Sequence, residues 1–318
     1  MLKTIFMNTL KLLVAGSLIG WLIGSGKLDF ELLTKLAQHP LAVLLAFTLT
    51  LGNFWLTSLR WKNILKARSQ NNLPITGMLK ITWIGQFFSS VLPGSVSGDL
   101  VKLLYVQSLD KSLSKKFVFA SILIDRLMGL SGLILLVGLS SLFFSSHILK
   151  DAPAMEPLLK VNYALSGLVL CALSIFYFLH SKIRLILVGL ESIIFPKIIS
   201  KIIILWDDLV SIRSRMVKAV LLSFCVQFTA VLIFWSLISP FVEGSMDFIQ
   251  ALAFIPLGLM TLALPVAPSG LGVGHAIFQK LFEFTGITNG ASLFNLYFVL
   301  TLSVNLLGVI PYLMSKRK

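Results

Sequence analysis

Long apolar runs separated by short polar stretches form the main pattern along the chain. A helix that crosses a bilayer needs roughly 20 mostly apolar residues, so this pattern predicts membrane-spanning helices. Six full spans are expected, at about residues 5–25, 40–60, 117–145, 158–180, 217–239 and 291–314. The first is interpreted as an uncleaved helix, and a cleaved signal peptide is the alternative, because lysines precede its apolar run.

Two further apolar segments are interrupted by proline and glycine. Residues 75–109 are broken at Pro93-Gly94, and residues 248–286 are broken from Pro265 through Gly274. Both interruptions contain a seven-residue stretch that begins Leu-Pro and ends Ser-Gly. Each segment is either a re-entrant hairpin or a pair of short crossing helices. Non-helical backbone at membrane depth must be buried in protein or line a wet cavity, so these interruptions are candidate functional regions.

Composition and charge support a membrane protein and orient it. Of the 318 residues, 57% are hydrophobic and 13% are charged, whereas a soluble domain has about 45–50% and about 25%. The net charge of +14 would suggest a nucleic-acid partner in a soluble protein. Here the basic loops 60–68 and 110–116 are assigned to the cytoplasm, and loops 26–39 and 239–247 to the outside. Both termini are therefore expected in the cytoplasm, with no nucleic-acid partner.

These observations predict an all-α integral membrane protein with one polytopic domain over residues 1–318. Its first half, 1–145, and its second half, 217–318, each contain one broken segment, and the loop charges give the two segments opposite orientations, as in an inverted repeat. Between the halves, residues 182–216 are expected to form an amphipathic helix on the cytoplasmic surface. Its basic residues either keep it on that side or recognise anionic lipids.

Four ionisable residues near or within the apolar sequence of the first half are candidate site residues. Charges inside a span are costly and mark function by default. Asp99 and Lys102 are three residues apart, on one helical face, and Asp125 and Arg126 are adjacent, about 100° apart around a helix. We expect Lys102 and Arg126 to bind a lipid phosphate, with Asp99 and Asp125 positioning them. Helix capping by Asp99 and structural pairing of Asp99 with Arg126 are the alternatives.

The two interruptions supply the other candidate residues. Small or glycine residues there allow close backbone approach, and a following helix start offers free N–H groups to an anion. His275 either titrates near neutrality or is a hydrogen-bonded structural group. The candidates from both interruptions are Ser97, Gly98, Ser269, Gly270, Gly272, Gly274 and His275.

Catalytic patterns are missing from the sequence. The four histidines are scattered and the two cysteines stand singly, so no metal-binding spacing occurs. No Gly-Lys-Ser/Thr phosphate loop or nucleophile elbow is present either. The sequence therefore predicts no catalytic residue, no metal, no cofactor and no enzyme activity.

Three motifs together resemble the lysylphosphatidylglycerol synthase transmembrane-region family, whose membrane domain is flippase-like. They are Pro-Gly-x-x-x-Gly-Asp-x-x-Lys from Pro93 to Lys102, Asp125-Arg126-x-x-Gly129, and Pro268 through Gly274 leading into His275. The chain departs from the family at three positions. The family commonly has Gly at the position of Ser97, Arg at that of Lys102 and Glu at that of His275. The last difference replaces an acid and leaves the role of His275 open.

The resemblance implies a bacterial inner-membrane lipid flippase or transporter. Its cargo is expected to be an anionic phospholipid or a polyprenyl-phosphate-linked lipid. Because the chain ends at Lys318, directly after its last span, aminoacylation by a soluble synthase domain is not expected. The alternatives are a non-catalytic scaffold or accessory subunit of a lipid- or polysaccharide-modifying system, and a lipid-modifying enzyme using Asp99 and His275. A homodimer or a partner lipid-modifying enzyme is also expected.

Overall fold

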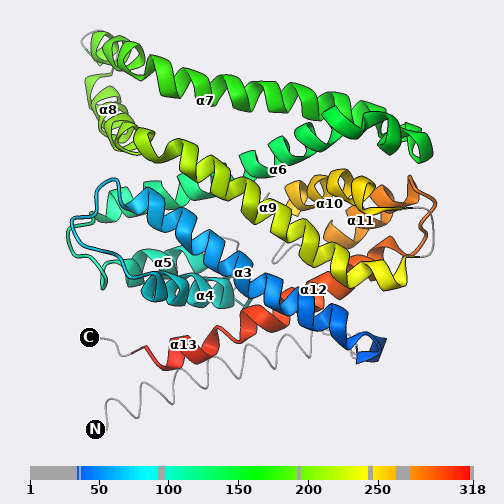
Figure 1. Ribbon diagram of the computed structural model, residues 1–318. Helices are drawn as coiled ribbons and strands as arrows, with labels where there is room; N and C mark the ends of the chain where they lie inside the picture. Colours follow the sequence, from blue (N-terminus) through cyan, green and yellow to red (C-terminus); the bar gives the residue numbers. More distant parts are fainter. Residues whose placement is uncertain are drawn as a thin grey trace.

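The computed structural model describes residues 34, 35, 37–91, 97–191, 195–242, 246–262 and 273–315, and within these ranges every regular element is helical (Figure 1). The long helices follow the apolar runs of the sequence. The elements, in chain order, are α3 (Pro40–Leu65), α4 (Ile75–Val91), α5 (Ser97–Val106), α6 (Lys115–Asp151), η1 (Pro153–Met155), α7 (Glu156–Glu191), α8 (Pro196–Ser211), η2 (Arg213–Arg215), α9 (Met216–Ile238), η3 (Ser239–Phe241), α10 (Phe248–Leu262), α11 (Val273–Glu283), α12 (Gly290–Leu306) and α13 (Val309–Leu313).

Five described helical segments are long and apolar enough to cross a membrane. They are Pro40–Leu65, Lys115–Asp151, Pro153–Glu191, Pro196–Phe241 and Gly290–Leu313, the fourth of which includes both α8 and α9. Five of the six expected full spans are therefore confirmed as long apolar helices. The expected span at 5–25 lies outside the described residues.

The broken segments are pairs of shorter helices. Helix α4 ends at Val91 and α5 begins at Ser97, while α10 ends at Leu262 and α11 begins at Val273. In each pair the two helices pack against each other. Figure 1 places α4 and α5 toward the end of the bundle where α3 ends, and α10 and α11 toward the end where α3 begins. The residues between the helices of each pair, including Pro93, Gly94 and Pro265, lie outside the described ranges, and the inverted repeat stays a prediction.

Helices α3, α6 and α9 run through the middle of the bundle and connect its two ends. Helix α3 packs along α9, and α6 contacts both α9 and α10. One apolar core contains stacked aromatic rings from α9, α11 and α12, with the ring centroids of Phe234 and Phe278 4.8 Å apart. A second core surrounds Trp61 near the end of α3. The second core lies beside the charged residues of the first broken segment.

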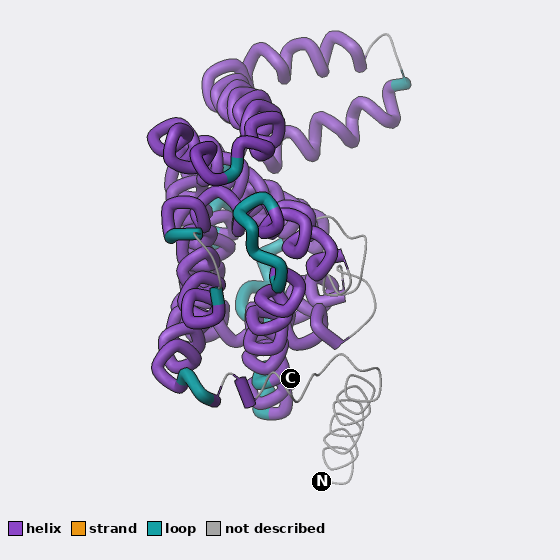
Figure 2. Tube along the Cα trace, turned by 90° about the vertical axis from the view of Figure 1, so that its right-hand side faces the viewer, coloured by secondary structure: helices purple, strands orange, loops and turns teal. Residues whose placement is uncertain are grey.

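Helices α7 and α8 differ from the predicted arrangement of residues 158–216. Helix α7 continues without interruption to Glu191, so residues 182–191 extend the span expected at 158–180. The amphipathic helix expected at 182–216 is confined to α8, Pro196–Ser211. Figure 2 shows the end of α7 and the start of α8 as an antiparallel arm that extends away from the other helices. Arg184 and Asp207 join the two helices of this arm, with Nε and Oδ1 2.8 Å apart.

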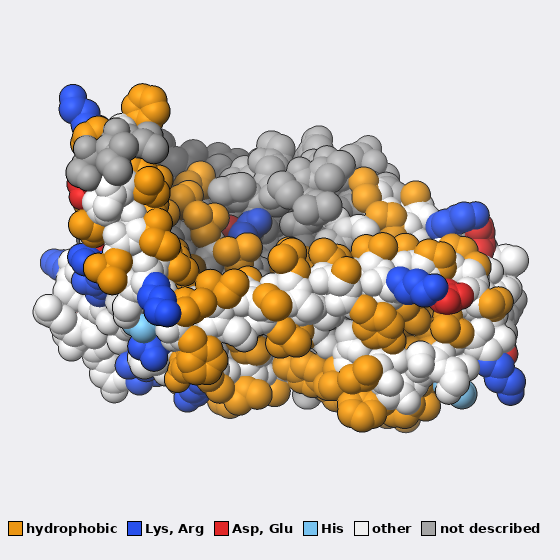
Figure 3. All heavy atoms as spheres, turned by 90° about the horizontal axis from the view of Figure 1, so that it is seen from above, with side chains coloured by type: hydrophobic (Ala, Val, Ile, Leu, Met, Phe, Trp, Pro, Cys, Tyr) orange, Lys and Arg blue, Asp and Glu red, His pale blue; other side chains and the backbone are white. Residues whose placement is uncertain are grey.

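The surface combines a broad apolar face with unevenly placed charges. Figure 3 shows apolar side chains spread along the face that α7 covers, and Lys and Arg side chains gathered mainly toward one end of the molecule. Leu142, Leu168, Phe178 and Leu185 on α6 and α7 are all exposed. Exposed apolar side chains in such number suit contact with lipid rather than water.

Asp110 joins the α3–α4 and α5–α6 loops. Its carboxylate accepts hydrogen bonds from the hydroxyls of Ser69 and Ser112, each 2.6 Å away, and from the side-chain amide of Asn71 at 3.0 Å. Burial by itself raises the pKa of Asp110, but the bonds from Ser112, Ser69 and Asn71 outweigh it and hold that pKa well below its ordinary value. This carboxylate therefore stays ionised while it is buried.

Candidate functional site

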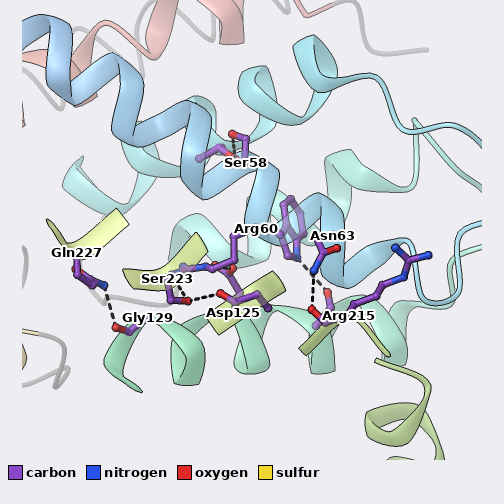
Figure 4. A network of polar contacts seen from close by, with 12 residues as sticks. Ser58, Arg60, Asn63, Asp125, Gly129, Arg215, Ser223 and Gln227 are labelled. Atoms are coloured by element: carbon purple, nitrogen blue, oxygen red, sulfur yellow. Dashed lines mark hydrogen bonds and ion pairs between the residues drawn. The ribbon is translucent and has the colours of Figure 1, made fainter. Parts of the chain in front are cut away.

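Two adjacent residues of α6, Asp125 and Arg126, have different partners on different helices. Asp125 accepts two hydrogen bonds from Arg60 of α3, from Nε at 2.7 Å and from Nη2 at 3.0 Å (Figure 4). Arg60 also donates to the hydroxyl of Ser223 on α9 at 3.2 Å. The two side chains of this ion pair are only 6% and 10% exposed. The pair therefore connects α3, α6 and α9 inside the bundle.

The position of Arg60 corrects its assignment to a cytoplasmic loop. Residues 60–68 were expected to be loop charges, but α3 continues to Leu65 and Arg60 faces α6 and α9. An arginine in that environment needs a carboxylate partner, and Asp125 provides it. Arg60 thus belongs to the site, although its position next to other basic residues made it resemble an orientation signal.

Neighbouring polar contacts hold the same helices together. Gln227 of α9 donates from its side-chain amide to the carbonyl oxygen of Gly129 on α6 at 2.9 Å. Asn63 of α3 donates to the carbonyl oxygen of Arg215 at 2.9 Å (Figure 4). In apolar surroundings an unmade hydrogen bond is costly, so these contacts fix the register of the helices around Asp125.

Arg126 pairs with Asp99 on α5. The distance from Arg126 Nε to Asp99 Oδ2 is 2.6 Å, and Lys102 Nζ lies 3.6 Å from Asp99 Oδ1. Asp99 stands in the first turn of α5, where the helix dipole favours a negative charge. Lys102 Nζ also lies 5.9 Å from the centroid of the Trp61 ring. The structure thus brings together the predicted residues Asp99, Lys102 and Arg126, and it shows the Asp99–Arg126 pair that the sequence left as an alternative.

Both ion pairs line one cavity, named the charged cavity. Its volume is about 580 Å³. Its described ionisable residues are Arg60, Asp99, Lys102, Asp125 and Arg126, so cations outnumber carboxylates by one. The α6 side of the cavity includes Leu123 and Leu127, which are both exposed. A cationic cavity therefore meets an exposed apolar surface along α6.

A second cavity adjoins the charged cavity and is named the neutral cavity. Its volume is about 390 Å³, and Gln86, Ser89 and Gln227 line both cavities. Its other polar lining includes Asn53 of α3 and Asn305 of α12. None of the described residues that line it is charged. Polar side chains thus continue from the charged cavity toward α12.

One known protein family matches the chain over most of its length. Residues 8–308 match the family described as the lysylphosphatidylglycerol synthase TM region. The chain belongs to this family. It is therefore a multi-pass integral membrane protein, and the resemblance inferred from the motifs is confirmed over nearly the whole chain. No curated protein sequence matches it.

The remaining candidate residues of this family member that the structure describes lie at helix contacts. Ser97 donates from its hydroxyl to the carbonyl oxygen of Phe88 at 3.2 Å. At Gly98, a Cβ atom would collide with the carbonyl oxygen of Gly85 and with the hydroxyl of Ser89, so glycine lets α4 and α5 meet closely. Gly98 therefore has a packing role beside the charged cavity.

The second interruption is described only in part. Ser269, Gly270 and Gly272 lie outside the described residues. Gly274 is packed so closely on the ring of Phe294 that a Cβ atom would collide with it. His275 contacts Phe294 and Phe298, with ring centroids 4.9 Å and 6.2 Å away, and both phenylalanines line the neutral cavity. The structure thus places Gly274 and His275 behind the wall of the neutral cavity and away from the described ionisable residues of the charged cavity.

Several polar residues that line these cavities were not predicted from the sequence as site residues. Besides Arg60, they are single amide side chains within apolar helices, namely Asn53, Gln86, Gln227 and Asn305. An isolated amide in a span is itself a signal, since it requires a hydrogen-bonding partner or water. Within the described ranges, no group of three or more histidine, cysteine or acidic side chains is placed to hold a metal ion.

Proposed function

We propose that this protein moves an anionic lipid, either a phospholipid or a polyprenyl-phosphate-linked lipid, between the two leaflets of a bacterial inner membrane. The observation that carries the proposal is the charged cavity, where an excess of cationic groups lies beside the exposed apolar surface of α6. A lipid phosphate requires the first environment and its acyl chains require the second. The family to which the chain belongs is consistent with this activity.

Arg126 is the residue best suited to bind the phosphate. Its side chain is 40% exposed, compared with 6% for Arg60, and it lines the cavity. Its planar guanidinium offers two parallel N–H donors to a phosphate. When a phosphate enters, Arg126 exchanges Asp99 for it, and Asp99 keeps Lys102 as a partner at 3.6 Å. In the resting state Asp99 thus balances the charge of Arg126, while the cavity as a whole keeps its excess of one cation.

Movement between leaflets requires that the site be reached from both sides. In this proposal α4–α5 and α10–α11 enter the membrane from opposite faces, with both termini in the cytoplasm, and the cavities between them carry the polar part of the lipid. The acyl chains remain along Leu123 and Leu127, outside the protein. No covalent step is involved, and a second copy of the chain or a lipid-modifying enzyme is the proposed partner.

A transport assay in proteoliposomes tests the proposal. Fluorescent anionic phospholipid and polyprenyl-phosphate lipid are placed in one leaflet, and their appearance in the other is followed by chemical quenching. We expect Arg126→Ala to slow transport at least about 10-fold, since a charge-assisted hydrogen bond contributes roughly 1.5–3 kcal/mol and 1.4 kcal/mol is a factor of 10.

Arg184→Ala is the matched control, because it also removes an arginine from an arginine–aspartate pair, but on the α7–α8 arm. Its rate should equal that of the wild type. If wild-type protein moves neither lipid faster than empty liposomes do, the transport proposal is wrong and the scaffold alternative is favoured.

A further inference from the structure

The position of the neutral cavity raises the question of what it holds. In the proposed function, a lipid phosphate bound at Arg126 has two substituents, and the acyl-bearing one lies along the exposed apolar side chains of α6. The other substituent, the headgroup, needs polar surroundings near the phosphate. The neutral cavity provides them, because Gln86, Ser89 and Gln227 belong to both cavities.

Asn305 supplies a buried hydrogen-bond acceptor to the neutral cavity. Its side chain is on α12, the residue is only 9% exposed, and its Nδ2 donates to the hydroxyl of Ser90 at 2.9 Å. Its Oδ1 is buried and has no hydrogen-bond partner among the described residues. An unsatisfied buried carbonyl is costly, so this atom indicates a ligand that donates an O–H or N–H group.

The charge of the lining decides between these donors. None of the described lining residues is acidic, and the sequences of 92–96 and 263–272, between the helices of each pair, contain no acidic residue. A buried ammonium group needs a carboxylate partner, whereas a hydroxyl is satisfied by an amide oxygen. The lining therefore suits a hydroxyl group and disfavours a cationic one.

The size of the neutral cavity agrees with a small headgroup. With about 30 Å³ for each water-sized group, a volume of about 390 Å³ accommodates roughly a dozen such groups. A glycerol or a single sugar fits this space.

We propose that the neutral cavity is a headgroup subsite that selects phosphodiester lipids with an uncharged, hydroxyl-bearing headgroup, and that Asn305 determines this specificity. The inference rests on the proposed function, since the charged cavity must hold the phosphate. The subsite would distinguish lipids by their headgroups, which phosphate binding at Arg126 does not do.

Three fluorescent lipids with the same acyl chains test the inference in proteoliposomes. They are phosphatidylglycerol, with a hydroxylated headgroup, phosphatidylethanolamine, with an ammonium headgroup, and phosphatidic acid, with none. We expect wild-type protein to move phosphatidylglycerol fastest. Asn305→Leu, which preserves the approximate size of the side chain, should slow phosphatidylglycerol about 5-fold to 10-fold, as expected for one lost hydrogen bond. The rate for phosphatidic acid should stay unchanged.

Two further variants separate specificity from folding. Asn289→Leu removes an amide that bonds the carbonyl oxygen of Phe241 outside both cavities, and it should leave the lipid preference intact. Thr301→Val removes a hydroxyl from the neutral cavity with little change in shape, and it should lower the preference for phosphatidylglycerol in the same direction as Asn305→Leu.

The outcomes distinguish the two proposals. If wild-type protein moves all three lipids at one rate, or if Asn305→Leu slows all three equally, the headgroup subsite is wrong while the transport proposal stands. Binding of the same lipids to purified protein in detergent is measured in parallel. A preference for phosphatidylglycerol in binding, without transport above empty liposomes, would support the subsite and overturn the transport proposal.

Discussion

The two arginine–aspartate pairs of the charged cavity begin at adjacent residues of α6 and differ in their surroundings. Asp125 turns inward to Arg60, and both side chains are almost fully buried, with two hydrogen bonds between them. Arg126 points toward Asp99 on α5, and its side chain is 40% exposed beside the cavity. An arginine–aspartate pair therefore occurs in two different environments, because adjacent residues of α6 point in directions about 100° apart around the helix.

This difference assigns different roles to the pairs. A buried charge cannot exchange its partner without a large desolvation cost, so Arg60–Asp125 is suited to hold α3, α6 and α9 together. A pair open to a cavity costs little to separate, because water or a ligand can replace one partner. Arg126–Asp99 is thus suited to bind and release an anion.

The largest expected effect comes from breaking the buried pair. Asp125→Ala leaves Arg60 as an uncompensated buried charge and should lower the free energy of unfolding by about 3–5 kcal/mol. Unfolding in mixed detergent micelles measures this change. The double variant Arg60→Met, Asp125→Leu removes both charges and should recover most of the loss. A loss below about 1 kcal/mol for Asp125→Ala would contradict the structural role.

An intermediate effect is expected at Asp110, whose described partners are all neutral. Its pKa lies below the ordinary value of 3.8 in the folded protein. A depressed folded-state pKa gives stability that is present above the unfolded pKa and lost as the pH falls through the folded pKa. Asp110→Ala should therefore lower the free energy of unfolding by about 1–3 kcal/mol at pH 7. The difference in the free energy of unfolding between Asp110→Ala and wild type should shrink progressively below pH 4. If that difference stays constant from pH 7 to pH 3, the stabilising role of the ionised Asp110 is contradicted.

The smallest effect on stability is expected at Arg126, which sharpens the comparison with Asp125. Arg126→Ala should lower the free energy of unfolding by less than about 1 kcal/mol, because the side chain is partly exposed and Asp99 retains Lys102. The same unfolding assay measures the loss of stability, and the transport assay shows whether the variant loses activity while it remains folded. A loss of stability as large as that of Asp125→Ala would make the second pair structural as well.

Much of the architecture could be predicted from local sequence. Apolar runs of about 20 residues predicted the long helices because backbone groups in a membrane must be satisfied within the helix. Proline and glycine in residues 75–109 and 248–286 predicted where the helices end, and α4, α5, α10 and α11 begin or end at these places. The length of α7 was missed, because residues 182–191 were assigned to the amphipathic segment, although a helix can extend beyond the bilayer.

The sequence by itself determined that this is a helical membrane protein, which family it belongs to, and which charges stand in or beside its apolar helices. It also determined that Asp125 and Arg126 face different directions, because residues are about 100° apart around a helix. Only the tertiary structure decided that Arg60, 65 residues away, is the partner of Asp125, and that Asn305 lies beside the first broken segment. Helical periodicity specifies which residues share a face of one helix. Which faces meet depends on the packing of helices far apart in the chain, and that packing forms the cavities.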